Sequence, residues 1–438
     1  MKLYPTIGLE IHAELLTNSK VFCTCSAEFG GEPNSRCCPV CSGLPGTLPV
    51  LNSKAVEYII KAGYIMNCEI SRFTKWDRKN YFYPDLPKAY QISQMPRPVC
   101  LGGHVDVTVD GEQKTMRINR IHLEEDAGKL VHDDIERVSL ADYNRCGIPL
   151  IEIVTEPDFH SAAEVIAFFE KIRLMLQYAG VCDGKLEQGS MRCDVNISLA
   201  EKDSDKLGTR TEVKNLNSTK AIQRAIEYEI YRQTELIENG ERVVQETLHF
   251  NDATGETSSL RSKEDAHDYR YFRDPDLVTI NVPRDVVESL KAEMPELPSD
   301  KCKRYIEELE IPEKDAQLLT KYRKISEFFD KACEGVKSAK SVSNFIIGQI
   351  FRRTETEADK ETFDVSITPE QLNELVKLID SGKIRNNLAK ATLEKMLDSS
   401  KGALDFISES DMAGLDENTV NELCKQAIEN NPKAVDDY

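Results

Sequence analysis

The sequence lacks any apolar run of membrane-spanning length, since no stretch of its 438 residues approaches the roughly 18 apolar residues of a helical span. The nucleotide-binding patterns G-x-x-x-x-G-K-[ST] and G-x-G-x-x-G are absent, and so is the zinc-protease pattern H-E-x-x-H. The first residues alternate instead of forming a basic and then apolar secretion signal. These absences exclude the common nucleotide-site and zinc-protease motifs, and we expect a cytoplasmic protein with no membrane contact.

The sequence lacks an excess of positive charge: 75 Asp and Glu residues outnumber 56 Lys and Arg residues, which gives a formal net charge of -19. Affinity for nucleic acid comes mainly from Lys and Arg that displace counterions from phosphates. A protein that coats RNA with its whole surface is therefore excluded. The segment from Arg72 to Arg97 is a local exception, rich in basic and aromatic residues. It suits a single-stranded RNA end, and equally an aromatic core loop with snorkelling charges.

The length allows two to four domains at about 100 to 200 residues each. The first part mixes strand-like alternation with Gly and Pro turns, whereas the chain from about Val287 onward is helical and charged. We therefore predict an α+β domain over 1–290, an all-α domain over 291–405 and the start of a helical tail over 406–438. Within the first domain, the patterns predict one helix from Ser161 to Gly180 and another from Asn217 or Ser218 to Gly240.

Three predicted strands share one amphipathic pattern, with apolar residues on one side and polar residues on the other. The outward positions are Gly8, Glu10, His12 and Glu14 in the first strand, Arg192, Asp194, Asn196 and Ser198 in the second, and Arg210, Glu212 and Lys214 in the third. For any one strand, a solvated sheet face is the better interpretation.

Glu152 favours a functional site over a solvated sheet face, because this carboxylate interrupts the apolar run 150–154. An unpaired buried carboxylate costs several kcal/mol or becomes protonated, so Glu152 should face a cation, a hydrogen-bonding partner or a cavity. Three further acids precede a turn at 124–126. Several carboxylates beside a histidine would hold a hard cation such as Mg²⁺. The interleaved Lys79, Arg192, Arg210 and Lys214 would supply the spread-out positive charge that phosphoryl transfer requires.

Cysteine is the other candidate ligand. Thirteen cysteines without regular spacing, in a chain expected to stay reduced, are interpreted first as metal ligands. Cys23 and Cys25, followed by Cys38 and Cys41 in a C-P-x-C-x-G turn, predict a closed structural Zn²⁺ site. Cys37 is an alternative to Cys38 at one ligand position. The other, isolated cysteines are expected to fill core positions.

Taken together, these segments resemble the B subunit of the heterotrimeric tRNA-dependent amidotransferase. Eight stretches carry the resemblance: G-L-E-I-H at 8–12, C-P-V-C-S-G-L-P-G at 38–46, R-K-N-Y-F-Y-P-D-L-P-K at 78–88, L-E-E-D-A-G-K at 123–129, D-Y-N-R-C-G-I-P-L-I-E-I-V-T-E-P at 142–157, G-S-M-R-C-D-V-N at 189–196, E-V-K-N-L-N-S at 212–218 and D-Y-R-Y-F at 268–272. They follow one another over nearly all of the first 280 residues, so the series is far more specific than any single motif.

The resemblance implies a cradle-like catalytic domain on a mostly antiparallel sheet with packed helices, then a helical domain, then a small helical tail that helps hold tRNA. It also implies a carbon–nitrogen ligase with glutamine as amide donor. ATP would phosphorylate the side-chain carboxyl of Glu-tRNA(Gln), Asp-tRNA(Asn) or both, and ammonia would displace the phosphate. An amidase-type A subunit would supply ammonia through a tunnel, and a small C subunit would complete the trimer. The two substrates differ by one methylene, so both stay open.

The resemblance also implies roles for individual residues. The Mg²⁺ ligands would be Glu10, His12, Glu125, Glu152 and Asp194. Lys79, Ser190 and Arg192 would lie near the phosphoryl group, with Glu125 also catalytic, and the ATP-binding cations would be Lys79, Arg192 and Lys214.

Three departures from the family pattern accompany the resemblance. Gln188 stands where many relatives have Glu, Arg273 replaces an expected Pro, and the sequence ends at Tyr438 where the tail normally continues. We expect a truncated or short tail, with weaker tRNA holding and intact activation chemistry. The alternative from another class is a non-catalytic, zinc-containing RNA-binding or scaffold protein. A closer rival, the archaeal paralogue specific for Glu-tRNA(Gln), carries an extra inserted domain for which 438 residues leave no room.

Overall fold

A computed structural model describes residues 3–95, 97–133, 135–201, 204, 206–262, 269–408, 411 and 425–426. The chain divides into two compact units, Met1–Pro295 and Glu296–Tyr438. The first unit is built on a large sheet with packed helices, and the second is helical, which confirms the predicted α+β class. None of the helices among these residues combines the length and the apolar character needed to cross a bilayer.

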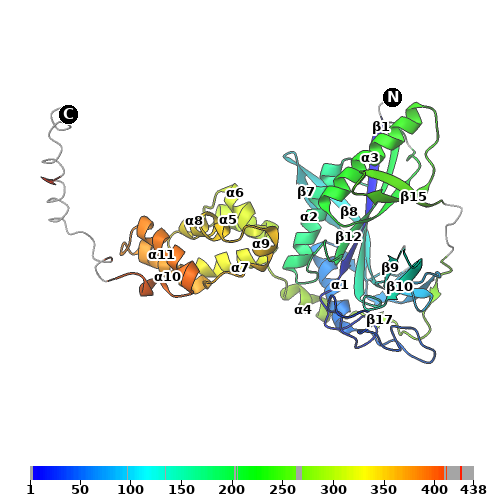
Figure 1. The fold of residues 1–438 in the computed structure, drawn as a ribbon, viewed down its shortest axis with the longest axis horizontal. Helices are drawn as coiled ribbons and strands as arrows, with labels where there is room; N and C mark the ends of the chain where they lie inside the picture. Colours follow the sequence, from blue (N-terminus) through cyan, green and yellow to red (C-terminus); the bar gives the residue numbers. More distant parts are fainter. Residues whose placement is uncertain are drawn as a thin grey trace. The chain divides into compact units, whose positions relative to one another are not determined.

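A ten-stranded sheet forms the centre of the first unit (Figure 1). Its order is β15-β14-β13-β12-β1-β11-β8-β6-β2, with β7 paired to β8. The strands are β1 (Leu3–Glu14), β2 (Glu69–Ile70), β6 (Cys100–Leu101), β7 (His104–Val109), β8 (Glu112–Glu125), β11 (Pro149–Thr155), β12 (Met191–Glu201), β13 (Thr211–Leu216), β14 (Glu246–Asn251) and β15 (Glu256–Ser262). Every pairing is antiparallel except that of β13 with β14. The expected mostly antiparallel sheet is therefore confirmed.

Two long helices pack on this sheet as the amphipathic patterns predict. Helix α2 (Ala162–Tyr178) contacts β7 and α3, and helix α3 (Thr219–Glu238) contacts β12, β13 and β15. Ser161 caps α2 by accepting a hydrogen bond from the backbone N–H of Glu164. In a complete capping box the Glu164 carboxylate would accept a hydrogen bond from the backbone N–H of Ser161. Here it accepts from the N–H of His160 instead. Of the two candidate caps of α3, Ser218 is the one used.

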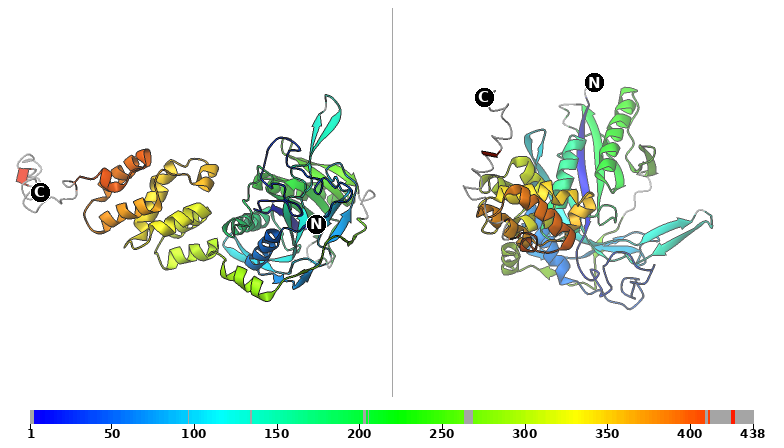
Figure 2. Two further views of the ribbon diagram at one scale, coloured as in Figure 1. Left: turned by 90° about the horizontal axis from the view of Figure 1, so that it is seen from below. Right: turned by 60° about the vertical axis from the view of Figure 1, so that its left-hand side comes forward.

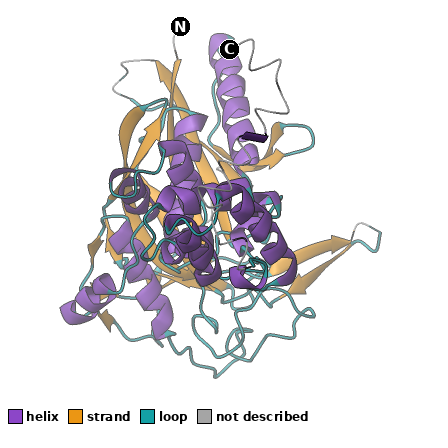
Figure 3. Cartoon of the chain, turned by 90° about the vertical axis from the view of Figure 1, so that its left-hand side faces the viewer, coloured by secondary structure: helices purple, strands orange, loops and turns teal. Residues whose placement is uncertain are grey.

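Smaller elements surround the sheet. Helices α1 (Ser53–Ile65) and α4 (Arg284–Ala292) pack together, and α1 also contacts β8. Strand β4 (Asp77–Asn80) joins β5 (Tyr90–Ser93) and β16 (Phe272–Arg273), while β3 (Phe73–Thr74) pairs with β17 (Ile280–Asn281). Strands β9 (Lys129–Asp133) and β10 (Val138–Asp142) form a hairpin that projects from the unit (Figures 2 and 3).

The basic and aromatic segment 72–97 contributes strands β3, β4 and β5, and two of its cations, Arg78 and Lys88, pair with carboxylates of the same unit. Arg78 pairs with Asp274 at 2.7 Å and with Asp276 at 3.0 Å, and its guanidinium lies 4.2 Å from the centre of the Tyr90 ring. Lys88 is likewise paired within the fold. For these two residues, the interpretation as an aromatic core loop is favoured over a free RNA-binding surface.

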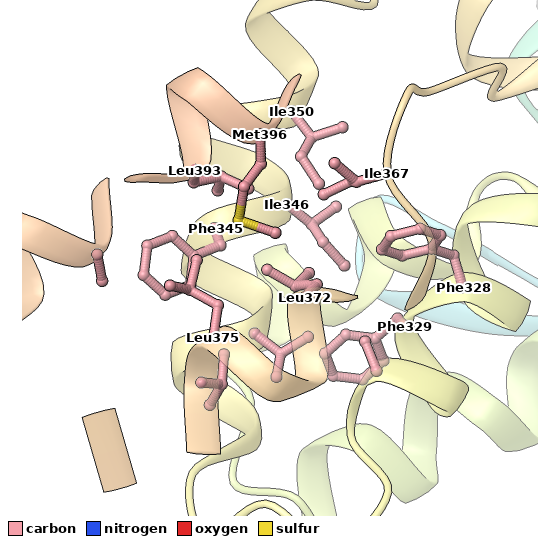
Figure 4. Close-up of a cluster of buried hydrophobic side chains, with 14 of the residues drawn as sticks. Phe328, Phe329, Phe345, Ile346, Ile350, Ile367, Leu372, Leu375, Leu393 and Met396 are labelled. Atoms are coloured by element: carbon pink, nitrogen blue, oxygen red, sulfur yellow. The ribbon is translucent and has the colours of Figure 1, made fainter. Parts of the chain in front are cut away.

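The second unit is a bundle of short helices around an aliphatic and aromatic core (Figure 4). Its helices are α5 (Pro298–Glu307), α6 (Glu313–Thr320), α7 (Arg323–Ala332), α8 (Ala339–Gly348), α9 (Glu357–Thr362), α10 (Pro369–Asp380) and α11 (Asn386–Ser399), with 3₁₀ turns η2 (Ile350–Arg352) and η3 (Ala403–Asp405). Phe329 of α7, Phe345 of α8 and Leu372 of α10 are at most 3% exposed. The tail domain predicted over 406–438 lies largely outside the described residues, and the boundaries at 290 and 405 stay predictions.

Candidate functional site

The polar side chains of five neighbouring strands lie beside one another on the central sheet. In the antiparallel register, His12 of β1 stands opposite Glu152 of β11 and Arg192 of β12, and Glu10 stands opposite Asp194. Glu152 in turn stands opposite His122 of β8. Because cross-strand neighbours share a face, residues far apart in the sequence meet in one patch.

Two histidines and two glutamates form the first part of this patch. The Nε2 atom of His12 lies 3.7 Å from a carboxylate oxygen of Glu124 and 3.5 Å from one of Glu152. His122 Nε2 lies at the same two distances, 3.7 Å from Glu124 and 3.5 Å from Glu152. One donor atom each from His12, Glu124 and Glu152 falls within 4.8 Å of the others. We refer to these three residues as the histidine triad.

A second group of carboxylates lies on the β12 side of the patch. Donor oxygens of Glu10, Asp194 and Glu212 also lie within 4.8 Å of one another, and we refer to them as the acidic triad. Lys214 compensates this group, because its Nζ lies 3.1 Å from Asp194 and 2.6 Å from Glu212. The backbone N–H of Asn215 donates to the other oxygen of Asp194 at 2.8 Å.

The electrostatics of the two triads differ. Burial and the neighbouring charge of Glu152 raise the pKa of Glu10, so this carboxyl is short of positive partners. Burial alone would raise the pKa of Glu152, but His122 and His12 outweigh it and hold this pKa below its usual value. For Asp194, burial would likewise raise the pKa, but Lys214, His12 and the N–H of Asn215 together outweigh burial and lower it.

Lys79 extends from β4 toward the same patch. Its ammonium lies 5.0 Å from the ring centre of Tyr269 and 5.7 Å from that of Tyr81, within the range of cation–π contacts. Burial opposes its charge, yet the carboxylates of Glu124 and Glu152 outweigh that cost and raise the pKa of Lys79. The side chain is therefore a fixed cation facing the histidine triad.

Glu125 lies outside both triads, whereas the resemblance placed it in the ligand set. Successive residues of a strand point to opposite faces, and Glu124 is the one directed at His12. The carboxylate of Glu125 instead accepts hydrogen bonds from Lys88 Nζ at 2.5 Å and from the backbone N–H of Ile92 at 3.0 Å. Glu124 was one of the three acids noted at 124–126, but the resemblance selected Glu125, although His122 two residues before Glu124 on the same strand face was a usable signal. The expected catalytic role of Glu125 stays a prediction.

Arg192 and Ser190 lie at the edge of the patch. The guanidinium of Arg192 makes a bidentate ion pair with Asp126, at 2.8 and 3.1 Å, so its charge is already shared. Ser190 is buried and lines a cavity of about 480 Å³ together with Glu14 and Gln188. The structure thus brings Glu10, His12, Glu152 and Asp194 together, and it places Ser190 in an adjoining cavity.

The four predicted zinc ligands form a separate cluster in the loops after β1. One sulfur from each of Cys23, Cys25, Cys38 and Cys41 lies within 4.8 Å of the others. The backbone N–H of Cys38 lies 3.2 Å from the sulfur of Cys41, and the Cys23 thiol and other donors lower the pKa of Cys41 to about 4. Cys37 instead directs its thiol to Asn144 at 3.9 Å. Four converging sulfurs with a stabilised thiolate fit tetrahedral Zn²⁺.

Comparison with known proteins agrees with this architecture. The family described as GatB/GatE catalytic domain matches residues 5–288, and the family described as GatB domain matches residues 327–438. The B subunits of several bacterial aspartyl/glutamyl-tRNA(Asn/Gln) amidotransferases are similar over the full chain. That of Caldicellulosiruptor saccharolyticus is 51% identical, covering 100% of this chain and 92% of its own. Those of Ruminiclostridium cellulolyticum and Thermoanaerobacter pseudethanolicus are 50% and 49% identical, covering 100% of this chain and 90% and 92% of their own. These matches confirm the resemblance, and the chain belongs to the family of aspartyl/glutamyl-tRNA(Asn/Gln) amidotransferase B subunits.

Proposed function

We propose that this chain activates the side-chain carboxylate of a mischarged tRNA with ATP and Mg²⁺, and then completes its amidation. A carboxylate oxygen of Glu-tRNA(Gln) or Asp-tRNA(Asn) attacks the γ-phosphorus, and ADP leaves. Ammonia then attacks the acyl carbon, phosphate leaves, and the nitrogen loses a proton, giving Gln-tRNA(Gln) or Asn-tRNA(Asn). The observation that carries the proposal is the meeting of the histidine triad, the acidic triad and Lys79 on one sheet face.

The residues present fit a divalent cation. Glu124 and Glu152 offer hard oxygen donors within reach of His12, whose Nε2 lies 3.7 and 3.5 Å from them. The histidine triad would hold the ion, with the acidic triad beside it. A bound Mg²⁺ ion supplies charge neutralisation for phosphoryl transfer.

The chain's own cations would serve the same reaction. Lys79 contacts the rings of Tyr269 and Tyr81, with its ammonium 5.0 and 5.7 Å from their centres, so this charge is oriented before substrate binds, as electrostatic stabilisation requires. Lys214 holds Asp194 and Glu212 in place, and Arg192 fixes Asp126. Ser190 in the adjoining cavity would contact the substrate rather than the metal.

The remaining parts of the proposal concern partners and stability. The cysteine cluster would hold a structural zinc, because its four ligands form a group separate from the two triads and no histidine of the described residues belongs to it. Ammonia would come from a glutaminase A subunit, with a small C subunit completing a cytoplasmic heterotrimer that binds mischarged tRNA. The helical unit would contribute to holding that tRNA.

The decisive experiment incubates the reconstituted trimer with γ-labelled ATP and each mischarged tRNA in turn. ADP that appears only with a mischarged tRNA supports the proposal and identifies the substrate. Glu124→Gln should lower this ADP formation about 10²- to 10³-fold, as the loss of one charge-stabilising group does in other enzymes. Glu112→Gln, at the exposed start of the same strand, is the matched control. Unchanged turnover in Glu124→Gln and Asp194→Asn would favour the scaffold alternative.

A further inference from the structure

Lys20 is the only lysine among the described residues with no exposed surface, and the reaction proposed above gives it no role. Its Nζ lies 3.7 Å from the sulfur of Cys41 and donates to the backbone carbonyl of Tyr143 at 3.1 Å. Burying an ammonium costs several kcal/mol unless a compensating negative charge lies nearby. The nearest group able to carry such a charge is the thiolate of Cys41.

The cysteine cluster needs a positive neighbour for the complementary reason. Cysteine binds metal as thiolate, so a zinc ion with four cysteines carries a net charge of about -2. Cys38 gives the cluster a backbone N–H, which carries no formal charge. The other lysine that lines the cavity beside the cluster is Lys88, and it is already paired with Glu125. Lys20 is thus the one cation in this cavity left to face the sulfurs.

We propose that Lys20 is a positioning residue for the zinc site: it offsets the charge of the tetrathiolate and ties the cluster to the 143–147 turn. This proposal rests on the proposed zinc site and goes beyond it, because it assigns a residue outside the ligand set. Partners outside the ligand shell usually contribute 10- to 100-fold in metal affinity.

The same side chain links the cluster to the strand that carries Glu152. Besides the contact of Lys20 with Tyr143, the N–H of Val21 donates to the carbonyl of Gly147 at 2.9 Å. Gly147 has φ of +80°, and a Cβ there would meet Lys20 and Cys41, each at 3.7 Å, and the carboxylate of Glu125 at 3.8 Å. The turn leads directly into β11 at Pro149. The cluster and the central sheet therefore share this turn, with Lys20 on one side of it.

The test compares zinc retention in full-length Lys20 variants. Zinc content after gel filtration and the rate of zinc transfer to a colorimetric chelator are measured for the wild type, Lys20→Met, Lys20→Gln and Lys20→Arg. We expect about 10- to 100-fold weaker zinc binding in the two neutral variants and near wild-type binding in Lys20→Arg. The matched control is Lys301→Met, which removes a buried ammonium from its pair with Asp330 in the helical unit.

The outcomes separate the two proposals. A wild-type chain that takes up no zinc would overturn the zinc site itself. A wild type with one tightly held zinc, beside neutral Lys20 variants within twofold of it, would overturn only the role of Lys20. A neutral variant that folds only in excess zinc supports the proposal, since added metal restores what the charge supplied. A neutral variant that stays unfolded in excess zinc, while Lys20→Arg folds, would overturn the proposal, because Lys20 would then act in folding alone.

Discussion

Glu14 provides a quantitative test of the electrostatics at the edge of the site. Burial and the nearby Asp126 raise the pKa of Glu14 from 4.5 to about 8. Arg192 and Arg145 outweigh burial at Asp126 and lower its pKa to about 2. Near neutral pH, Glu14 is therefore a protonated carboxyl that donates to an ionised one. Glu14→Gln keeps a donor at this position and removes the titration.

The sign and size of the effect follow from linkage. Between pH 4.5 and about 8 the folded state binds a proton at Glu14 that the unfolded state has lost, so stability falls as pH rises through this window. At about 1.4 kcal/mol for each pH unit, the ceiling is about 5 kcal/mol. Because Glu14 is only partly buried and solvent screens its charge, we expect about 2 to 4 kcal/mol between pH 5 and pH 8.

The assay is urea unfolding of wild type and Glu14→Gln from pH 5 to pH 8.5, followed by the fluorescence of Trp76. This residue is the only tryptophan of the chain and lies in the same unit, so the signal reports the unit under test. We expect the free energy of unfolding of Glu14→Gln to increase relative to that of the wild type as pH rises. The control is Glu28→Gln. Glu28 lines the same cavity as Glu14 and Ser190, but its side chain is 76% exposed, so the pH profile of this variant should run parallel to that of the wild type. Parallel profiles for Glu14→Gln as well would refute the shared-proton interpretation.

Three further predictions test the fold and the zinc cluster. Phe329→Ala, at a fully buried position of the helical core, should cost about 3 to 5 kcal/mol in far-ultraviolet circular dichroism melts; Leu404→Ala, at a residue 54% exposed, should cost far less. Ser161→Ala should cost about 1 kcal/mol by removing the cap of α2, and Ser161→Asp should restore it. The ring of Trp76 lies 5.1 Å from that of Phe22, which directly precedes Cys23 of the cysteine cluster. Removal of zinc with a chelator should therefore change the emission of Trp76. An unchanged spectrum would argue against a metal at the cluster.

The polar face was predictable because its signal is local. Alternation places Glu10 and His12 on the polar side of β1, and Asp194 on the polar side of β12, without knowledge of any partner strand. The helix caps at Ser161 and Ser218 are equally local, since the capping side chain and the N–H that donates to it lie three residues apart.

Which acid of β8 joins the polar face, and which partner Arg192 takes, depend on strand pairing as well as on the local pattern. Choosing between Glu124 and Glu125 requires the phase of β8, which is set where His122 meets Glu152 across the β8–β11 ladder. The pairing of Arg192 with Asp126 joins residues 66 positions apart. Motif resemblance gave no distances between side chains, so it assigned Arg192 to the phosphoryl group without accounting for its partner.

The distribution of cations decides which triad is suited to an external metal. In the acidic triad, the ammonium of Lys214 pairs with both Asp194 and Glu212. It therefore already neutralises part of the negative charge that a metal ion would offset. In the described part of the chain, only imidazole nitrogens come within ion-pair distance of Glu124 and Glu152. Lys79 acts on them from farther away through its charge. A divalent cation therefore fits best at the histidine triad, where no lysine or arginine of the described residues lies within ion-pair distance of the two carboxylates.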